Sequence, residues 1–118
     1  MVQHLVPKDN FMKLLELISE SEEKKNKFCE FAEKRLGGAS KIVENAKEKG
    51  GPAMLTYHHF VVKLPYYKEV SEGKFNMSEA KKEFTKTLKS ISINMKQNDF
   101  QREVGRLEVL GELIIKNK

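Results

Sequence analysis

Two adjacent histidines and all three tyrosines of the chain lie in one short stretch, as Tyr57, His58, His59, Tyr66 and Tyr67. Imidazole rings bind metal ions and transfer protons near neutral pH, and tyrosine hydroxyls hydrogen-bond to small ligands. The five side chains are therefore a candidate ligand-binding or enzyme site. That hypothesis predicts a cavity lined by all of them together.

The spacing of the two histidines argues against a metal site. Neighbouring side chains on a helix point about 100° apart, whereas two helical ligands of one ion need a spacing of three or four residues. We therefore expect one of His58 and His59 to bond a core group while the other faces outward. No metal and no cofactor is predicted.

Catalytic motifs are not visible in the sequence. The single cysteine, Cys29, lies on the flank of an apolar helical face, where cysteine usually acts as a small hydrophobic residue. The two aspartates, Asp9 and Asp99, occupy positions typical of helix starts. Because no phosphate loop, dinucleotide fingerprint or nucleophile elbow is present, we predict no catalytic residue and expect a non-catalytic protein.

Basic residues are concentrated in the last third of the chain. Residues 76–118 hold nine Lys and Arg against six acidic residues, so three of the five net positive charges lie there. A lysine stripe on one helix, extended by two arginines of the next, could follow a phosphate backbone. The candidate nucleic-acid contacts are Lys82, Lys86, Lys89, Lys96, Arg102 and Arg106.

Helical periodicity dominates the chain that positions these residues. An apolar stripe of Phe11, Leu14, Leu15 and Ile18 has the spacing of one helix face. Ser19–Glu22 fits a capping box and predicts a break before the next helix. Helices are predicted from about residue 10 to this break, from the break to the glycines at 37 and 38, over 40–49, 52–64 and 77–95, and from 99 onward.

The segment from Pro52 to Leu64 is predicted to be the central, buried helix. Pro52 suits the first turn of a helix, and Pro65 ends or kinks it. Lys63 is the one Lys, Arg, Asp or Glu between the two prolines. A helix that is apolar on most sides is usually enclosed by its neighbours.

Length and composition fit one small domain covering residues 1–118. A single cysteine excludes an internal disulfide and is typical of a reducing compartment. The first residues do not resemble a secretory leader, and no apolar run approaches the roughly 20 residues of a membrane span. We therefore expect a soluble cytoplasmic protein that does not enter a membrane.

Together these patterns predict an all-α, compact, single-domain bundle of five or six helices. The function predicted first is a non-catalytic module for protein–protein interaction or self-association. Its candidate interface is a second apolar strip on the last helix, formed by Val109, Leu113 and Ile115. The alternatives are nucleic-acid binding through the lysine stripe and a ligand or metal site around His58 and His59.

Overall fold

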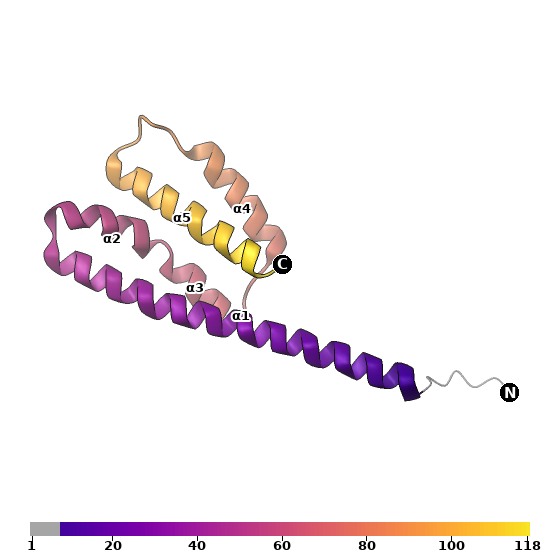
Figure 1. Ribbon diagram of the computed structural model, residues 1–118. Helices are drawn as coiled ribbons and strands as arrows, with labels where there is room; N and C mark the ends of the chain where they lie inside the picture. The colour runs from indigo at the N-terminus through magenta and orange to yellow at the C-terminus, as the bar shows by residue number, and fades with distance from the viewer. Residues whose placement is uncertain (1–7) are drawn as a thin grey trace.

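The computed structural model describes residues 8–118, and within that range it contains helices and no strand. The predicted all-α class is confirmed. Figure 1 shows the elements in order along the chain. They are α1 (Lys8–Lys49), the 3-10 helix η1 (Gly51–Ala53), α2 (Met54–Val61), α3 (Leu64–Ser71), α4 (Met77–Ser90) and α5 (Gln97–Lys116).

The helices lie side by side in one row. Helix α1 packs against α2 and α3, α2 packs against α5, and α5 packs against α4 (Figure 1). The Cα atoms extend over 77 × 30 × 15 Å with a radius of gyration of 20.0 Å, whereas a compact domain of this length has a radius of roughly 13–14 Å. The prediction of a compact bundle is therefore wrong, because a single row has no second layer and α1 continues far beyond it.

Helix α1 is one continuous helix where three were predicted. The expected breaks at Ser19–Glu22 and at Gly37 and Gly38 do not occur. The capping sequence at Ser19–Glu22 does not end the helix, because the helical turns before it continue through it. At the second site, neither Gly37 nor Gly38 adopts positive φ. The chain first turns at Gly50 and Gly51, which have φ of 62° and 55°, a conformation that suits glycine.

The C-terminal half of α1 is anchored by a seam of small and aromatic side chains. The buried residues recur at intervals of four and seven, which keeps them on one face of the helix. Three of them are alanines, so α2 and α3 can approach the α1 backbone closely. The seam consists of Phe28, Ala32, Ala39 and Ala46.

The predicted central helix over 52–64 is divided and only partly buried. It comprises η1, α2 and the first residue of α3, and α2 contains no fully buried residue. In a one-layer row, α2 is covered by α1 on one side and α5 on the other, and its remaining surface meets solvent. The expectation of an enclosed helix is therefore wrong, although Lys63, which directly precedes α3, is 7% exposed.

Helix α5 lies inside the row and packs on two opposite sides. Val109, Leu110 and Leu113 are almost completely buried. Gly105 faces α2 so closely that a Cβ at this position would lie 2.0 Å from the carbonyl oxygen of His59. Close packing of the two backbones therefore requires a glycine at this position.

Candidate functional site

The two histidines of α2 contact side chains of α5. His58 Nδ1 accepts a hydrogen bond from Arg102 Nε at 3.0 Å. His59 Nδ1 lies 3.2 Å from Gln101 Oε1, and His59 Nε2 lies 3.1 Å from Glu108 Oε2. The expectation that one ring faces outward is wrong, since both rings join α2 to α5.

A buried lysine completes this contact. Lys63 Nζ donates a hydrogen bond to Glu108 Oε1 at 3.0 Å and lies 4.7 Å from the centre of the Phe60 ring. Burial opposes ionisation of Glu108, but the hydrogen bond and charge of Lys63, together with His59, outweigh it and lower the pKa of Glu108 below 4.5. The sequence singled out Lys63 as an isolated charge, but no local pattern identified its partner 45 residues away.

The tyrosines at the start of α3 bind carboxylates from two different helices. The Tyr66 hydroxyl donates to Glu83 of α4, and the Tyr67 hydroxyl donates to Glu112 of α5. Burial and these hydrogen bonds raise the pKa of both tyrosines well above the ordinary value of 10.0. A neutral, donating hydroxyl is therefore the stable form in each case.

The predicted ligand cluster is divided among separate contacts. Tyr57 packs edge-on against His58, with ring centres 5.3 Å apart. Tyr66 and Tyr67 line different hollows, one beside α4 and the other beside α1. The polar atoms of the two histidines, Tyr66 and Tyr67 bond protein groups, so these side chains serve packing between the helices in this structure.

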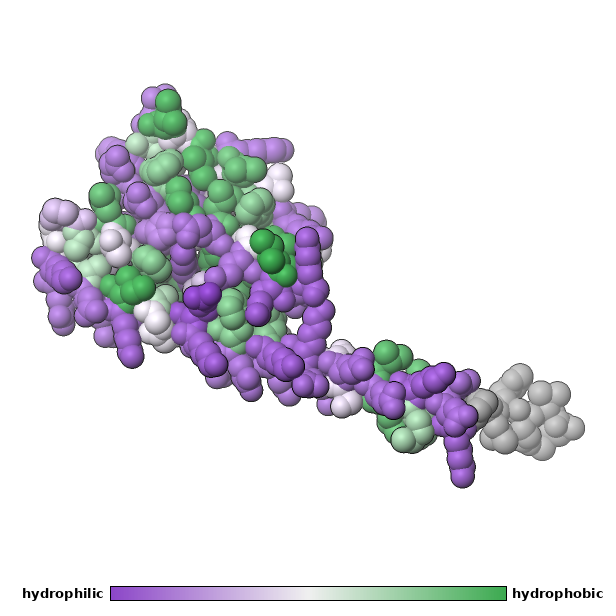
Figure 2. Space-filling model, in the orientation of Figure 1, coloured by the Kyte–Doolittle hydropathy of each residue, from purple (hydrophilic) through white to green (hydrophobic). Residues whose placement is uncertain are grey.

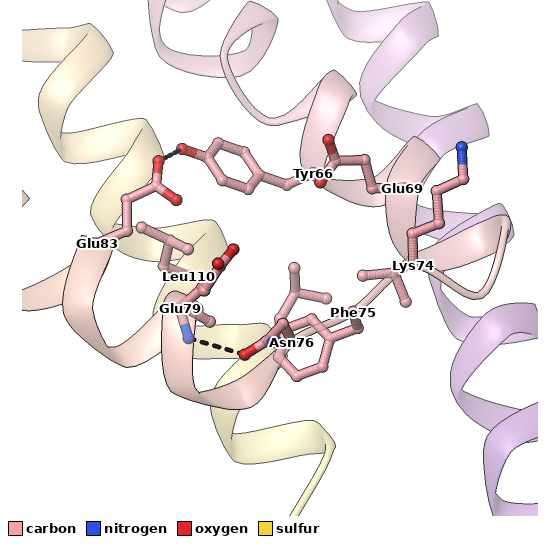
Figure 3. Close-up of a pocket in the computed structure, with 11 residues that line it drawn as sticks. Tyr66, Glu69, Lys74, Phe75, Asn76, Glu79, Glu83 and Leu110 are labelled. Atoms are coloured by element: carbon pink, nitrogen blue, oxygen red, sulfur yellow. Dashed lines mark hydrogen bonds between the residues drawn. The ribbon is translucent and has the colours of Figure 1, made fainter.

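The hollow beside Tyr66 is small and lined by carboxylates. Figure 3 shows it between α3 and α4, with Leu110 of α5 beneath and the hydrogen bond from Tyr66 to Glu83 on one side. Glu69 and Glu79 also line it. Its volume of about 90 Å³ is far below the 300–1,000 Å³ typical of ligand sites. Tyr66 also lines two wider, open hollows of about 390 and 500 Å³, but none of the other four predicted side chains lines either of them.

The predicted basic patch is not continuous. Lys82, Lys86 and Lys89 are exposed on α4, on the face opposite the buried Ala80 and Thr87. The remaining basic candidates lie elsewhere. Lys96 directly precedes α5, and Arg102 and Arg106 lie on α5 itself.

Acidic residues neutralise the part of this surface where α4 and α5 meet. Arg106 forms an ion pair of 2.6 Å with Glu103, and Arg102 bonds His58. Lys86 and Arg106 line one open hollow, but Glu83 and Glu103 line it too. A phosphate backbone would therefore meet both signs of charge there.

The predicted interface on α5 is largely part of the core. Val109 is 0% exposed and Leu113 is 1% exposed, whereas Ile115 is 71% exposed. The prediction is wrong for Val109 and Leu113, because α5 lies inside the row and the side taken as free packs against its neighbours. A single exposed isoleucine near the end of a helix does not form a surface patch.

A different apolar surface lies on the part of α1 that projects from the row. We call residues 8–27 the α1 extension, and every residue in it is exposed. Six of its side chains, all within residues 11–18, are large and apolar, and we call them the apolar zone. They are Phe11, Met12, Leu14, Leu15, Leu17 and Ile18, which are 44–61% exposed.

The apolar zone covers more than half of the circumference of the helix. At about 100° per residue its six side chains span an arc of roughly 220°, with Lys13 and Glu16 on the remainder. Ordinary surface helices bury a stripe of little more than 100°. Figure 2 shows this hydrophobic surface near the N-terminal end of the extension, separated from the rest of the molecule by polar side chains.

The surface area of the chain is unusually large. It amounts to 8839 Å², whereas a compact chain of 13.6 kDa exposes about 6,600 Å². Covering the exposed half of the six apolar side chains is worth roughly 5–9 kcal/mol, at 1.5–3 kcal/mol for each side chain that is fully buried. The apolar zone is therefore the largest cluster of exposed, large apolar side chains among the described residues.

Neither a metal centre nor a membrane span is found among residues 8–118. No group of three or more His, Cys, Asp or Glu side chains there is placed to hold a metal ion. No helix in that range is both long and apolar enough to cross a bilayer. Comparisons of the chain with protein families, curated proteins and solved structures found no match, so we infer function from the geometry of its own surface.

Proposed function

We propose that this chain is a protein–protein interaction module that presents the apolar zone of α1 to an apolar surface of a partner. The observation that carries the proposal is the exposure of six large apolar side chains within eight residues of a projecting helix. Phe11, Leu14, Leu15 and Ile18 have the i, i+3, i+4, i+7 spacing with which a helix anchors itself in a groove or bundle.

The rest of the molecule holds this helix in place. The seam from Phe28 to Ala46 fixes α1 against α2 and α3, and the extension continues the same helix outward. Glu23 and Lys27 support the exposed part with an ion pair of 3.3 Å across one turn. A helix of about eight residues is marginal alone in water, so continuity with the anchored half preorganises the apolar zone for binding.

The part of the lysine stripe that lies on α4, namely Lys82, Lys86 and Lys89, supports nucleic-acid binding less well. Its three lysines are exposed, but the arginines expected to extend it bond Glu103 and His58 instead. Phosphate-binding surfaces gain affinity from many cations of one sign. Three lysines on a helix edge are also the usual pattern of a solvated face.

Site-specific photo-crosslinking tests the proposal. A photoreactive amino acid replaces Leu15 in the full chain, and a matched variant carries it at the exposed Glu44 on the anchored half of α1. In the cells that produce the protein, we expect discrete protein adducts from position 15 and none from position 44. Failure of position 15 to yield any adduct, or identical adducts from both positions, would refute the proposed function.

A further inference from the structure

We propose that the partner of the apolar zone is the same zone of a second copy of this chain, paired in the antiparallel direction. This inference rests on the proposed function and names its partner. It adds one observation to the exposure of residues 11–18: this segment is complementary to a second copy of itself that runs in the opposite direction.

The reversed pairing matches residue types at every level. With a two-fold axis between Leu14 and Leu15, Phe11 of one chain lies level with Ile18 of the other, and Met12 lies level with Leu17. The one basic and one acidic residue of the segment, Lys13 and Glu16, are also brought level. A two-fold contact of this kind is isologous, so each pairing occurs twice.

Parallel pairing lacks this complementarity. It would place Lys13 level with Lys13 and Glu16 level with Glu16 on the polar sides of the two helices, so that like charges lie at the same level of the pair. It would also align the helix dipoles and bring the two packed bodies to the same end of the helix pair. The charges and the shape of the chain therefore favour the antiparallel direction.

The polar stretch between the apolar zone and the body has the length that antiparallel pairing needs. In this register Lys8 of one chain lies level with Ser21 of the other, and the first buried residue of α1 is Phe28. The described helix of each copy therefore ends before it reaches the buried seam of its partner. Residues 19–27, which are polar throughout, act as the spacer.

The width of the apolar zone also fits other copies of the chain. One antiparallel neighbour covers one side of the apolar arc of roughly 220°. The other side accepts a second antiparallel neighbour, so that two pairs form a four-helix cluster.

Sedimentation equilibrium of the full chain tests self-association. We expect a mass of two or four chains at high micromolar concentration, which is about 27 or 54 kDa from the chain mass of 13.6 kDa. Leu14→Glu should weaken association at least 100-fold. The matched control is Leu88→Glu, since Leu88 is 55% exposed on α4 and Leu14 is 50% exposed; it should leave association unchanged.

Distances between spin labels test the direction of pairing. In a Cys29→Ser background, a label at Asn26 should lie roughly 35–40 Å from its symmetry mate in an antiparallel pair and about 10–15 Å in a parallel one. The long distance supports the proposal. A short distance without the long one, equal effects of Leu14→Glu and Leu88→Glu, or the mass of one chain at every concentration overturns it.

The two proposals fail in distinguishable ways. If the chain remains monomeric but yields a photo-adduct whose mass is not a multiple of the chain mass, it binds another protein. That result retains the proposed function and rejects self-pairing. A monomeric chain that yields no adduct from position 15 rejects both. Leu14→Glu replaces an exposed side chain of the α1 extension. An unchanged urea midpoint will therefore show that weaker association of this variant does not result from a loss of folding.

Discussion

Adding one methyl group at Gly105 disrupts the contact between α2 and α5. The Cβ of an alanine there would lie 2.0 Å from the carbonyl oxygen of His59 and 2.9 Å from Cγ2 of Val62. Because a carbonyl oxygen of a helix cannot move alone, the two helices must separate by about 1 Å to bring this contact to 3.0 Å, the limit below which real Cβ contacts essentially never occur.

The size of the effect follows from opposing contributions. Overpacking costs about 1–3 kcal/mol, and separation of the helices also weakens the hydrogen bonds of His59 and Lys63, at about 1 kcal/mol each. Alanine in place of glycine recovers about 0.5–1 kcal/mol of helix stability. We therefore expect Gly105→Ala to lower the free energy of unfolding by about 2–4 kcal/mol.

Three other glycines provide matched controls. A Cβ at Gly37 or Gly38 would meet no atom within 4 Å, and one at Gly111 would lie 3.4 Å from the Phe84 ring. Alanine should therefore stabilise the chain by about 0.5–1 kcal/mol at Gly37 or Gly38 and leave it nearly unchanged at Gly111. Urea unfolding followed by circular dichroism measures all four variants, and equal stability of Gly105→Ala and Gly111→Ala would refute the packing of α2 on α5.

Two further predictions concern pH and are measured as urea midpoints. Burial and the bond to Glu112 raise the pKa of Tyr67 above 10.0, so its contribution is complete below pH 10 and is lost as the pH rises. Tyr67→Phe should flatten this alkaline loss, and an unchanged slope would contradict it. The pKa of Glu108 is lowered from 4.5, so its contribution is present above pH 4.5 and is lost on acidification. Glu108→Gln should flatten this loss of stability on acidification. At pH 7 it should also lower the urea midpoint more than Lys63→Met does, because it leaves the buried Lys63 without its carboxylate. The reverse order of the two midpoints would show that the pair contributes little.

Local sequence signals predicted much of the secondary structure. Asn76 caps α4 through its side chain, which accepts from the backbone N–H of Glu79, and asparagine is one of the residue types that favour this position. Gly50 and Gly51 end α1. These features depend on residues within one or two turns of each other, which is the range that a sequence pattern describes.

Tertiary arrangement was not predictable from the same patterns. An apolar stripe shows that a helix has a face to bury, but not whether that face meets its own chain. The stripe of Phe11 to Ile18 has the spacing of one helix face and is exposed, whereas Val109 and Leu113 were predicted as an interface and are buried. The partners of Lys63 and Tyr67 lie 45 residues away in each case, beyond any local signal.

The most direct test of the account is hydrogen exchange of the α1 extension at two concentrations. At a dilution where sedimentation shows single chains, the amides of residues 8–27 should exchange much faster than those of the anchored half of α1, because every residue of the extension is exposed. At high concentration they should become protected while the body stays unchanged. Protection of residues 8–27 equal to that of the anchored half in the single chain would contradict a projecting apolar zone.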